Sequence, residues 1–290
     1  SLIWAVVLGV VGLLHGTALA SSWQTMASPP VALDGSVSVL TVDGKILVSG
    51  GRNGNSTASS RLAFLFDPAK NMWVRVGDMN VARRDHAAVR LPSGKILVAG
   101  GWLDDTFTNA AEIFDPLSGT WRAVASMADR RYLHRMTALR DGRVLVTGGY
   151  AFTQPPPQRA QIFDEASETW LDAGFTRTRG RTAATLLGNG DVLLTGGDNG
   201  SDIAVPTAEI FSSSTRTWIQ TSPMAYARQR HGSALLKDGR VLVTGGYYAD
   251  QTWASAPSEI YDPATQQWSS SAGLAPASAD FSLVVLDASR

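Results

Sequence analysis

Short runs of apolar residues recur along the chain, and each is bounded by polar residues or glycine. In Lys95–Ala99, four apolar residues follow a lysine and lead directly into Gly100-Gly101. A run of this length is too short for a helix, and its unbroken apolar character is typical of a β-strand buried on both faces. No long segment carries the 3.6-residue period of an amphipathic helix, so the pattern predicts a chain that is almost entirely β.

Dipeptides that favour tight turns stand just before several of these runs. They are Ser93-Gly94, Asp141-Gly142, Asn189-Gly190 and Asp238-Gly239. Each turn predicts a hairpin partner upstream of the apolar run, as in Ala87–Leu91. Downstream, a polar loop leads to an alternating segment such as Ala111–Pro116, and a further segment carries a tryptophan. Each unit is therefore predicted to contain four short strands.

The same unit is repeated along the chain. The decapeptide DGRVLVTGGY occurs at 141–150 and again at 238–247. Gly-Gly pairs begin at residues 50, 100, 148, 196 and 245, in steps of 50, 48, 48 and 49 residues. Tryptophan keeps the same spacing at Trp23, Trp73, Trp121, Trp170, Trp218 and Trp268. Markers that stay in phase over this distance indicate a repeat architecture in which each unit packs on its neighbours.

A third marker lies between the Gly pair and the tryptophan, as in Phe114-Asp115-Pro116 and Tyr261-Asp262-Pro263. Gly-Gly after an apolar strand, then Phe/Tyr-Asp-Pro, then Trp, resembles the kelch motif, and the resemblance extends from Trp23 to Leu286. It implies an all-β kelch β-propeller whose blades are four-stranded sheets. Glycines without side chains would let each tryptophan pack closely against the next blade, so we interpret both as structural.

The two ends of the chain are expected to share one blade. Phe281–Leu286 matches the first strand of a unit, and Trp23 matches a fourth strand with no unit before it. Kelch propellers commonly close their ring with a blade built from both termini. The resemblance therefore implies five complete four-stranded blades plus an incomplete sixth blade shared by the two termini, and a seven-bladed parent stays open.

The first twenty residues differ from the rest of the chain. Leu2–Leu14 is apolar apart from glycine, and Ala18-Leu19-Ala20 has the small-x-small pattern of a signal-peptidase site. We expect residues 1–20 to be a signal peptide, truncated at its start because no basic residue precedes the apolar run, and residues 21–290 to be the propeller. This predicts a secreted or extracytoplasmic protein, in the periplasm or on the cell surface. A membrane anchor is the alternative, although thirteen apolar residues are short for a span.

Composition narrows the functions that the chain could have. The 25 basic residues balance 25 acidic ones and form no basic run, which argues against a nucleic-acid partner. The absence of cysteine excludes disulfides, thiolate zinc sites and cysteine nucleophiles. It also argues against the copper chemistry of kelch relatives that resemble galactose oxidase, whose site uses a tyrosine crosslinked to cysteine. We therefore expect no metal, no cofactor and no catalytic residue.

Candidate ligand contacts lie in the long loops that follow the Gly pairs. In a four-stranded blade, the loop between strands 2 and 3 emerges at the same edge as the segment that connects two blades, so these segments are predicted to form one face. Aromatic rings beside carboxylates suit a glycan or a peptide. The candidates are Trp102, Asp104, Tyr150, Asp198, Tyr247 and Trp253. The alternative is that these side chains pack against neighbouring blades.

A second set of candidates lies in the segments between blades. Seventeen residues before a Gly pair stand Arg83, Arg131, Arg179 and Arg228, and fourteen residues before stand His86, His134 and His231. By analogy with kelch propellers, these positions begin the innermost strands and ring the mouth of the central channel. A ring of arginine and histidine favours anionic groups. The alternative is that both are repeat consensus and bond to backbone carbonyls between blades.

The sequence therefore favours a secreted or surface kelch propeller that acts as a binding module for a glycan or a protein partner on the long-loop face. No integral membrane span is expected in the mature chain. The alternative is a carbohydrate-modifying enzyme, similar to a sialate mutarotase, with an acid/base pair in the channel mouth and an arginine on a sugar carboxylate.

Overall fold

The computed structural model describes residues 25–271 except 55, 152–158, 178 and 248–256. Every regular element in this part of the chain is a β-strand. The strands form five four-stranded antiparallel sheets and one two-stranded hairpin. The prediction of an all-β chain is confirmed.

Each sheet takes its four strands from one stretch of the chain. Blade 1 contains β1 (Leu33–Leu40), β2 (Ile46–Asn53), β3 (Ala63–Asp67) and β4 (Met72–Arg75). Blade 2 contains β5 (Ala87–Arg90), β6 (Ile96–Ala99), β9 (Ala111–Asp115) and β10 (Thr120–Val124), with the hairpin β7 (Trp102–Leu103) and β8 (Thr106–Phe107) in its loop. Blade 3 contains β11 (Arg135–Ala138), β12 (Val144–Thr147), β13 (Arg159–Asp164) and β14 (Thr169–Phe175). Blade 4 contains β15 (Ala183–Leu186), β16 (Val192–Thr195), β17 (Ala208–Ser212) and β18 (Thr217–Thr221). Blade 5 contains β19 (Gly232–Leu235), β20 (Val241–Thr244), β21 (Ser258–Asp262) and β22 (Gln267–Ser271).

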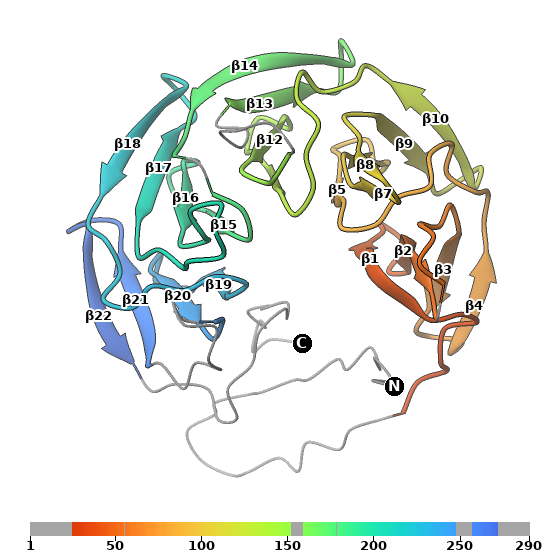
Figure 1. Ribbon diagram of the computed structural model, residues 1–290, viewed down its shortest axis with the longest axis horizontal. Coiled ribbons are helices and arrows are strands. Elements are labelled where there is room, and N and C mark those ends of the chain that lie inside the picture. The colour runs from red at the N-terminus through yellow and green to blue at the C-terminus, as the bar shows by residue number, and fades with distance from the viewer. Residues whose placement is uncertain (1–24, 55, 152–158, 178, 248–256, 272–290) are drawn as a thin grey trace.

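The five sheets stand around a common centre like the blades of a propeller (Figure 1). The first strand of each blade is innermost, and β1, β5, β11, β15 and β19 contact one another in that order. The fourth strands form the rim. These are the five complete blades that the repeat predicts. The expected sixth blade falls on residues 1–24 and 272–290, which lie outside the described residues, so it stays a prediction.

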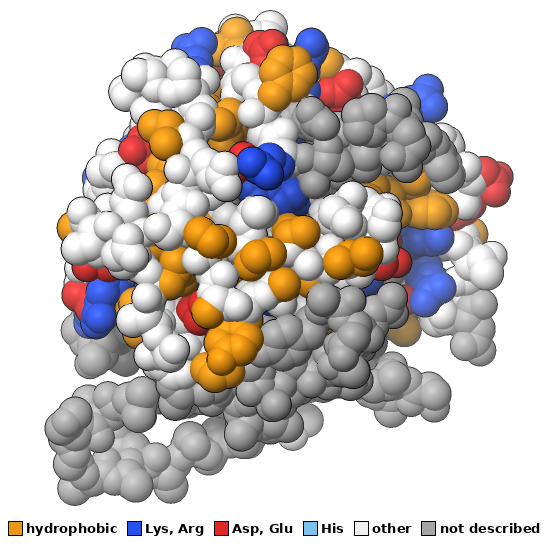
Figure 2. Space-filling model, turned by 60° about the vertical axis from the view of Figure 1, so that its left-hand side comes forward, with side chains coloured by type: hydrophobic (Ala, Val, Ile, Leu, Met, Phe, Trp, Pro, Cys, Tyr) orange, Lys and Arg blue, Asp and Glu red, His pale blue; other side chains and the backbone are white. Residues whose placement is uncertain are grey.

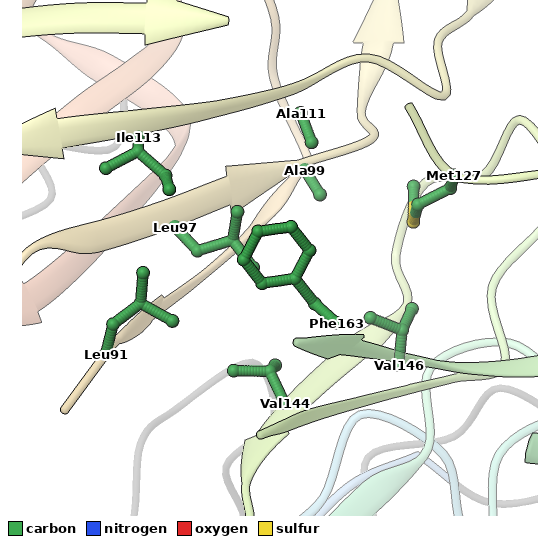
Figure 3. Packing of buried hydrophobic residues seen from close by; sticks show 9 residues of the cluster. All are labelled: Leu91, Leu97, Ala99, Ala111, Ile113, Met127, Val144, Val146 and Phe163. Atoms are coloured by element: carbon green, nitrogen blue, oxygen red, sulfur yellow. The ribbon is translucent and has the colours of Figure 1, made fainter. Parts of the chain in front are cut away.

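The hydrophobic core is divided among the junctions between neighbouring blades. At the junction of blades 2 and 3, Leu97 and Ile113 of one blade face Val144 and Phe163 of the other, and Phe163 is fully buried (Figure 3). Similar clusters fill the other described junctions. Burying one such large apolar side chain contributes about 1.5–3 kcal/mol, so each blade depends on its neighbours for its core.

Each periodic tryptophan in the described residues also joins two blades. Its ring packs against the aromatic residue of its own third strand, as Trp121 does against Phe114 with centroids 4.9 Å apart. Its indole N–H donates to a backbone oxygen at the end of the preceding blade. The bonds run from Trp121 to Gly77 (2.7 Å), from Trp170 to Ala125 (2.6 Å), from Trp218 to Ala173 (2.8 Å) and from Trp268 to Ser222 (2.7 Å). The structural role predicted for these residues is confirmed.

Trp73 of blade 1 makes the same bond to a residue that precedes the first blade. Its indole N–H donates to the carbonyl of Ala27 at 2.8 Å, and the N–H of Ala27 donates to Asn71 Oδ1 at 2.6 Å. The carbonyl of Ala27 thus accepts the bond that, for the other tryptophans, is accepted by a carbonyl at the end of the preceding blade. The outer strand predicted around Trp23 lies outside the described residues and stays a prediction.

Replacing Trp170 with Phe keeps a ring between blades 2 and 3 but removes the N–H that bonds to Ala125. We expect the free energy of unfolding to fall by about 1 kcal/mol in this variant and by about 3 kcal/mol in Trp170→Ala. Urea denaturation of the three proteins measures both changes. A Phe variant as stable as the parent would show that the indole bond contributes nothing.

Candidate functional site

The repeated arginines lie inside the junctions between blades. Arg83 is fully buried, and its Nη1 donates to the carbonyls of Gly100 (2.7 Å) and Ala110 (2.8 Å) of blade 2. Its Nη2 donates to Glu112 Oε1 at 2.7 Å. The carbonyl of Arg83 accepts a hydrogen bond from the N–H of Gly51 in blade 1 at 2.9 Å. One residue therefore fastens two blades, and we call this arrangement the arginine clamp.

The clamp recurs at the next three junctions. Arg131, Arg179 and Arg228 are each buried and donate from the guanidinium to the first glycine carbonyl of their own blade: Gly148 (3.1 Å), Gly196 (3.3 Å) and Gly245 (3.1 Å). Their carbonyls accept from the second glycine of the preceding blade: Gly101 (2.8 Å), Gly149 (3.0 Å) and Gly197 (2.9 Å). Gly148 and Gly149, in the first copy of the repeated decapeptide, thus take part in two clamps. Gly148 accepts from Arg131 of its own blade, and Gly149 donates to the carbonyl of Arg179 of the next.

A carboxylate neutralises the buried guanidinium in three blades. The pairs are Arg83 with Glu112, Arg179 with Glu209 and Arg228 with Glu259. In blade 3 the same place is taken by Gln161, and Arg131 instead contacts the partly exposed Asp129 at 3.3 Å. Burial without a buried carboxylate lowers the pKa of Arg131 to about 10.

The three repeated histidines are also buried in the junctions. His86 Nε2 lies 3.3 Å from Ser49 Oγ, and His231 Nε2 lies 2.8 Å from Thr195 Oγ1, each across a junction. Burial lowers the pKa of His86 to about 3 and the pKa values of His134 and His231 well below the ordinary range. All three imidazoles are therefore uncharged at neutral pH.

This placement corrects the expectation that the arginines and histidines line the channel mouth and hold an anion. The guanidinium groups have no exposed surface on which a ligand could bind, and the histidines carry no charge to attract one. The alternative interpretation, repeat consensus that bonds to backbone carbonyls between blades, agrees with the contacts of the arginines. The histidines bond to hydroxyl groups instead, or to no protein group in the case of His134.

An arc of four backbone hydrogen bonds runs through the five described blades, near the start of their innermost strands. It joins equivalent residues with positive φ: Gly35, Asp85, Leu133, Arg181 and Arg230. The N–H of each donates to the carbonyl of the preceding one, at 2.8 Å for Asp85, 2.9 Å for Leu133, 3.4 Å for Arg181 and 3.0 Å for Arg230. We call it the backbone belt. The belt positions carry Gly, Asp and Leu in blades 1 to 3 and Arg in both blades 4 and 5, so they vary more than the arginine of the clamp. These positions were not predicted from the sequence, although their variation within a regular repeat is visible there.

The loops between strands 2 and 3 and the segments between blades form one face, as predicted. The residue after each Gly pair forms a backbone bridge with the residue after the repeated arginine. The bridges join Arg84 to Trp102, Tyr132 to Tyr150, Gly180 to Asp198 and Gln229 to Tyr247. We call this side of the molecule the long-loop face.

Four rings on the long-loop face form a continuous aromatic cluster. Trp102 meets the edges of Phe107 and Tyr132, with centroids 4.9 and 5.0 Å apart. Phe107 stacks on Tyr132 at 4.5 Å, and Tyr132 lies 5.4 Å from Tyr150. The guanidinium of Arg84 lies 5.5 Å from the Trp102 ring. The structure therefore brings Trp102 and Tyr150 together through Tyr132, which the sequence analysis did not single out.

The remaining loop candidates lie apart from this cluster or at its border. The indole N–H of Trp102 donates to the carbonyl of Asp104 at 2.9 Å, and the Asp104 side chain is half-exposed. The Tyr247 ring lies 6.0 Å from the guanidinium of Arg230. Trp253 lies outside the described residues, so its role stays a prediction.

Asp198 is buried beneath the long-loop face. Its Oδ1 accepts a hydrogen bond from Gly200 N at 2.8 Å, and its Oδ2 lies 3.6 Å from Arg181 Nη1, which also pairs with Asp202. Burial raises the pKa of Asp198 to about 6. Asp198 Oδ2 has no hydrogen-bond partner, but the side chain is fully buried, so it does not present a carboxylate on the surface.

The described residues contain no group of three or more His, Cys, Asp or Glu side chains placed to hold a metal ion. They also contain no helix long and apolar enough to cross a membrane.

Two family models described as the Kelch motif match the chain, one over residues 35–80 and one over residues 83–128. These ranges correspond to blades 1 and 2 with their connecting segments. The chain is also 30% identical over 92 residues to Kelch repeat and BTB domain-containing protein 1 of cowpox virus (strain GRI-90 / Grishak) and of vaccinia virus (strain Copenhagen). The similar stretch covers 31% of this chain and 16% of each viral protein. The match thus spans about a sixth of the length of these relatives.

Acidification should destabilise the fold through the buried histidines. The pKa of His86 is about 3 in the folded chain, against an ordinary value of 6.5. Between these values the unfolded chain binds a proton that the folded chain does not. Stability therefore falls as the pH drops below about 6.5, by up to about 1.4 kcal/mol per pH unit for each such histidine. Thermal melting across this range measures the slope, and His231→Gln should flatten it. A slope that the substitution leaves unchanged would contradict the assignment.

A hydroxyl group beside His134 should stabilise the protein. Neither ring nitrogen of His134 has a hydrogen-bond partner, and Ala99 stands where Ser49 faces His86. A Cβ on Gly50 or on Gly100 would lie 2.6 Å from the respective histidine Cε1, so the two imidazoles are placed alike. We expect Ala99→Ser to raise the free energy of unfolding by about 1 kcal/mol, and Ser49→Ala to lower it by a similar amount. Denaturant titration of both variants measures the two changes. A destabilised Ala99→Ser would show that there is no room for the oxygen beside His134.

Proposed function

Because this chain is a kelch-repeat protein, we propose that it is a binding module that docks a partner protein on its long-loop face. Kelch repeats generally mediate interactions between proteins. The opposite face carries the tight turns, which repeat from blade to blade, whereas the long loops differ. Residues that set the choice of partner need not recur in every blade, so the variable face is the better candidate.

The aromatic cluster is the observation that carries this proposal. Trp102, Tyr132 and Tyr150 are each partly exposed, and they connect blades 2 and 3 in one surface. Tryptophan, tyrosine and arginine are the residues on which binding energy most often concentrates in protein interfaces. Arg84, whose side chain lies against Trp102, adds a charged group at the border of the cluster.

Charged pairs of both signs surround the cluster. Arg52 pairs with Asp34 on the blade 1 side, and Arg181 pairs with Asp202 on the blade 4 side. A mixed rim of this kind favours a partner with complementary charges and fits the chain's overall neutrality. Figure 2, which brings the side with β15–β22 forward, shows hydrophobic side chains in small groups among polar ones, with a compact group of Lys and Arg side chains among them.

We further propose that residues 1–20 direct export, so that the partner is met outside the cytoplasm. This rests on the apolar run Leu2–Leu14 and on Ala18-Leu19-Ala20. A glycan bound by the same face is the other outcome that the experiment below distinguishes, because aromatic rings beside Asp104 would also suit a sugar.

Trp102→Ala should weaken partner binding at least tenfold while the protein remains folded. The matched control is Leu117→Ala, since Leu117 is 99% exposed in the turn between β9 and β10 on the opposite face. The tagged full chain is crosslinked in an extract of its source, the captured partner is identified, and its affinity for the parent and both variants is measured. Because the Trp102 ring contacts Phe107 and Tyr132, thermal melting must be measured beside the affinity.

Three results would count against the proposal. Binding lost in Leu117→Ala and kept in Trp102→Ala would place the interface on the turn face. Glycan binding that requires Trp102, with no captured protein, would show that the ligand of this face is a glycan and not a protein. Binding that survives both substitutions would remove the aromatic cluster from the interface.

A further inference from the structure

The junction between blades 3 and 4 differs from the other described junctions. Four residues before each repeated arginine stand Met79, Met127, Phe175 and Met224. The methionines are buried, and each Cε lies 3.2 Å from the position that a Cβ on the first glycine of the preceding blade would occupy. Phe175 is 62% exposed instead. The side chain at this position, which is buried in the other junctions, is therefore exposed in the junction between blades 3 and 4.

A second side chain is replaced at the same junction. His86, His134 and His231 each bring Cε1 to 2.6 Å from that glycine position, whereas blade 4 has Thr182, whose Oγ1 lies 3.6 Å from it. The hydroxyls of Thr182 and Thr147 are buried and have no hydrogen-bond partner. Threonine is much smaller than histidine, so two of the groups that fill the other junctions are absent from this one.

A groove of about 500 Å³ opens at this junction. Its lining includes Phe175, Thr176, Arg177, Asn199, Thr207 and Glu209. Sites for small molecules typically enclose roughly 300–1,000 Å³, so the groove is large enough for one. The aromatic cluster belongs to blades 2 and 3, and none of its four residues lines the groove.

The groove combines an aromatic ring with hydrogen-bond donors. Asn199 Oδ1 accepts from Ser201 N, which leaves the amide NH₂ to donate. Thr207 Oγ1 accepts from Arg179 Nη1 at 3.0 Å and so keeps its own hydrogen for a ligand. Arg177 spends one N–H on Gln220 Oε1 and has further donors in its guanidinium. These groups suit a ligand that is rich in acceptor oxygens.

The charge of the groove is positive on balance. Arg179 and Glu209 neutralise each other on its wall. The guanidinium of Arg177 is exposed, and that of Arg159 lies 5.7 Å from the ring of Phe175. Arg177 therefore lines the groove and Arg159 stands beside its exposed ring, which favours a ligand that carries a carboxylate.

We propose that this groove binds an acidic sugar residue such as a hexuronic acid. The sugar ring packs on Phe175, its carboxylate pairs with Arg177, and its hydroxyls accept from Asn199 and Thr207. A sugar offers an apolar C–H face and a dense set of oxygens, which is the combination that this lining matches. This site is separate from the docking of a partner protein on the aromatic cluster and does not depend on it.

The experiment titrates the full chain with sodium glucuronate and with glucose, followed by NMR and by calorimetry. Saturable binding of glucuronate, with glucose at least tenfold weaker, is the expected result. Arg177→Ala and Phe175→Ala should each weaken glucuronate binding at least tenfold. Both residues are exposed, so neither substitution removes a buried contact. Leu117→Ala is the matched control and should leave the affinity unchanged.

A junction-filling variant gives the sharpest test. Phe175→Met combined with Thr182→His restores the residues found at the other junctions. We expect it to raise the melting temperature and to weaken glucuronate binding at least tenfold, because the Phe175 ring that lines the groove is lost. No saturable binding by the parent, equal affinity for glucose, an affinity unaffected by Arg177→Ala, or undiminished binding in the filled variant would each overturn the proposal. If the filled variant did not fold, the Arg177→Ala comparison would still decide the question.

Discussion

The arginine clamp is the interaction on which the arrangement of the blades depends. In each clamp the buried guanidinium donates to a glycine carbonyl of its own blade, and the backbone carbonyl of the same arginine accepts from a glycine N–H of the blade before. Removing one partner of such a buried charge costs about 3–5 kcal/mol, because the remaining group is left desolvated. The clamp also explains the first glycine of each pair: a Cβ on Gly50 would lie 2.4 Å from the carbonyl oxygen of Arg83. The most repetitive residues of the chain are therefore those that join blades.

The strands were predictable because their signal is local and repeated. Lys95–Ala99 reads as a buried strand from its own residues, and β6 occupies Ile96–Ala99. The burial of Arg83 was not predictable, since the local sequence of an arginine after a polar loop is compatible with either an exposed or a buried side chain. The contact of Trp102 with Tyr132 depends on the relative placement of two segments of different blades, which no single repeat encodes. Aligning the repeats shows from the sequence alone that Phe175 stands where blade 2 is preceded by Met79. That this change leaves the space beside Gly148 unfilled could be seen only in the structure.

Blade 3 and its junction with blade 4 carry most of the departures from the repeat. Gln161 replaces a carboxylate, Phe175 replaces a methionine and Thr182 replaces a histidine. Each change gives up a contact that the other junctions keep, and the pairing of β13 with β14 shifts register between Arg159 and Gln161 of β13. A repeat protein gains stability from uniform junctions, so departures that gather at one place indicate a requirement other than stability.

The backbone belt has an electrostatic consequence. Through the five described blades its hydrogen bonds all run in the same sense, from the N–H of one blade to the carbonyl of the blade before, so the peptide dipoles follow one another along an arc. Dipoles aligned along a circle have little component along its axis, in contrast to those of a helix, which add along their common direction. The potential that an approaching molecule meets at the centre is therefore set by the side chains of the belt. In the described blades the charged belt residues are Asp85, Arg181 and Arg230, and Arg181 is already paired with Asp202, so the charge met there depends on which of these side chains are neutralised.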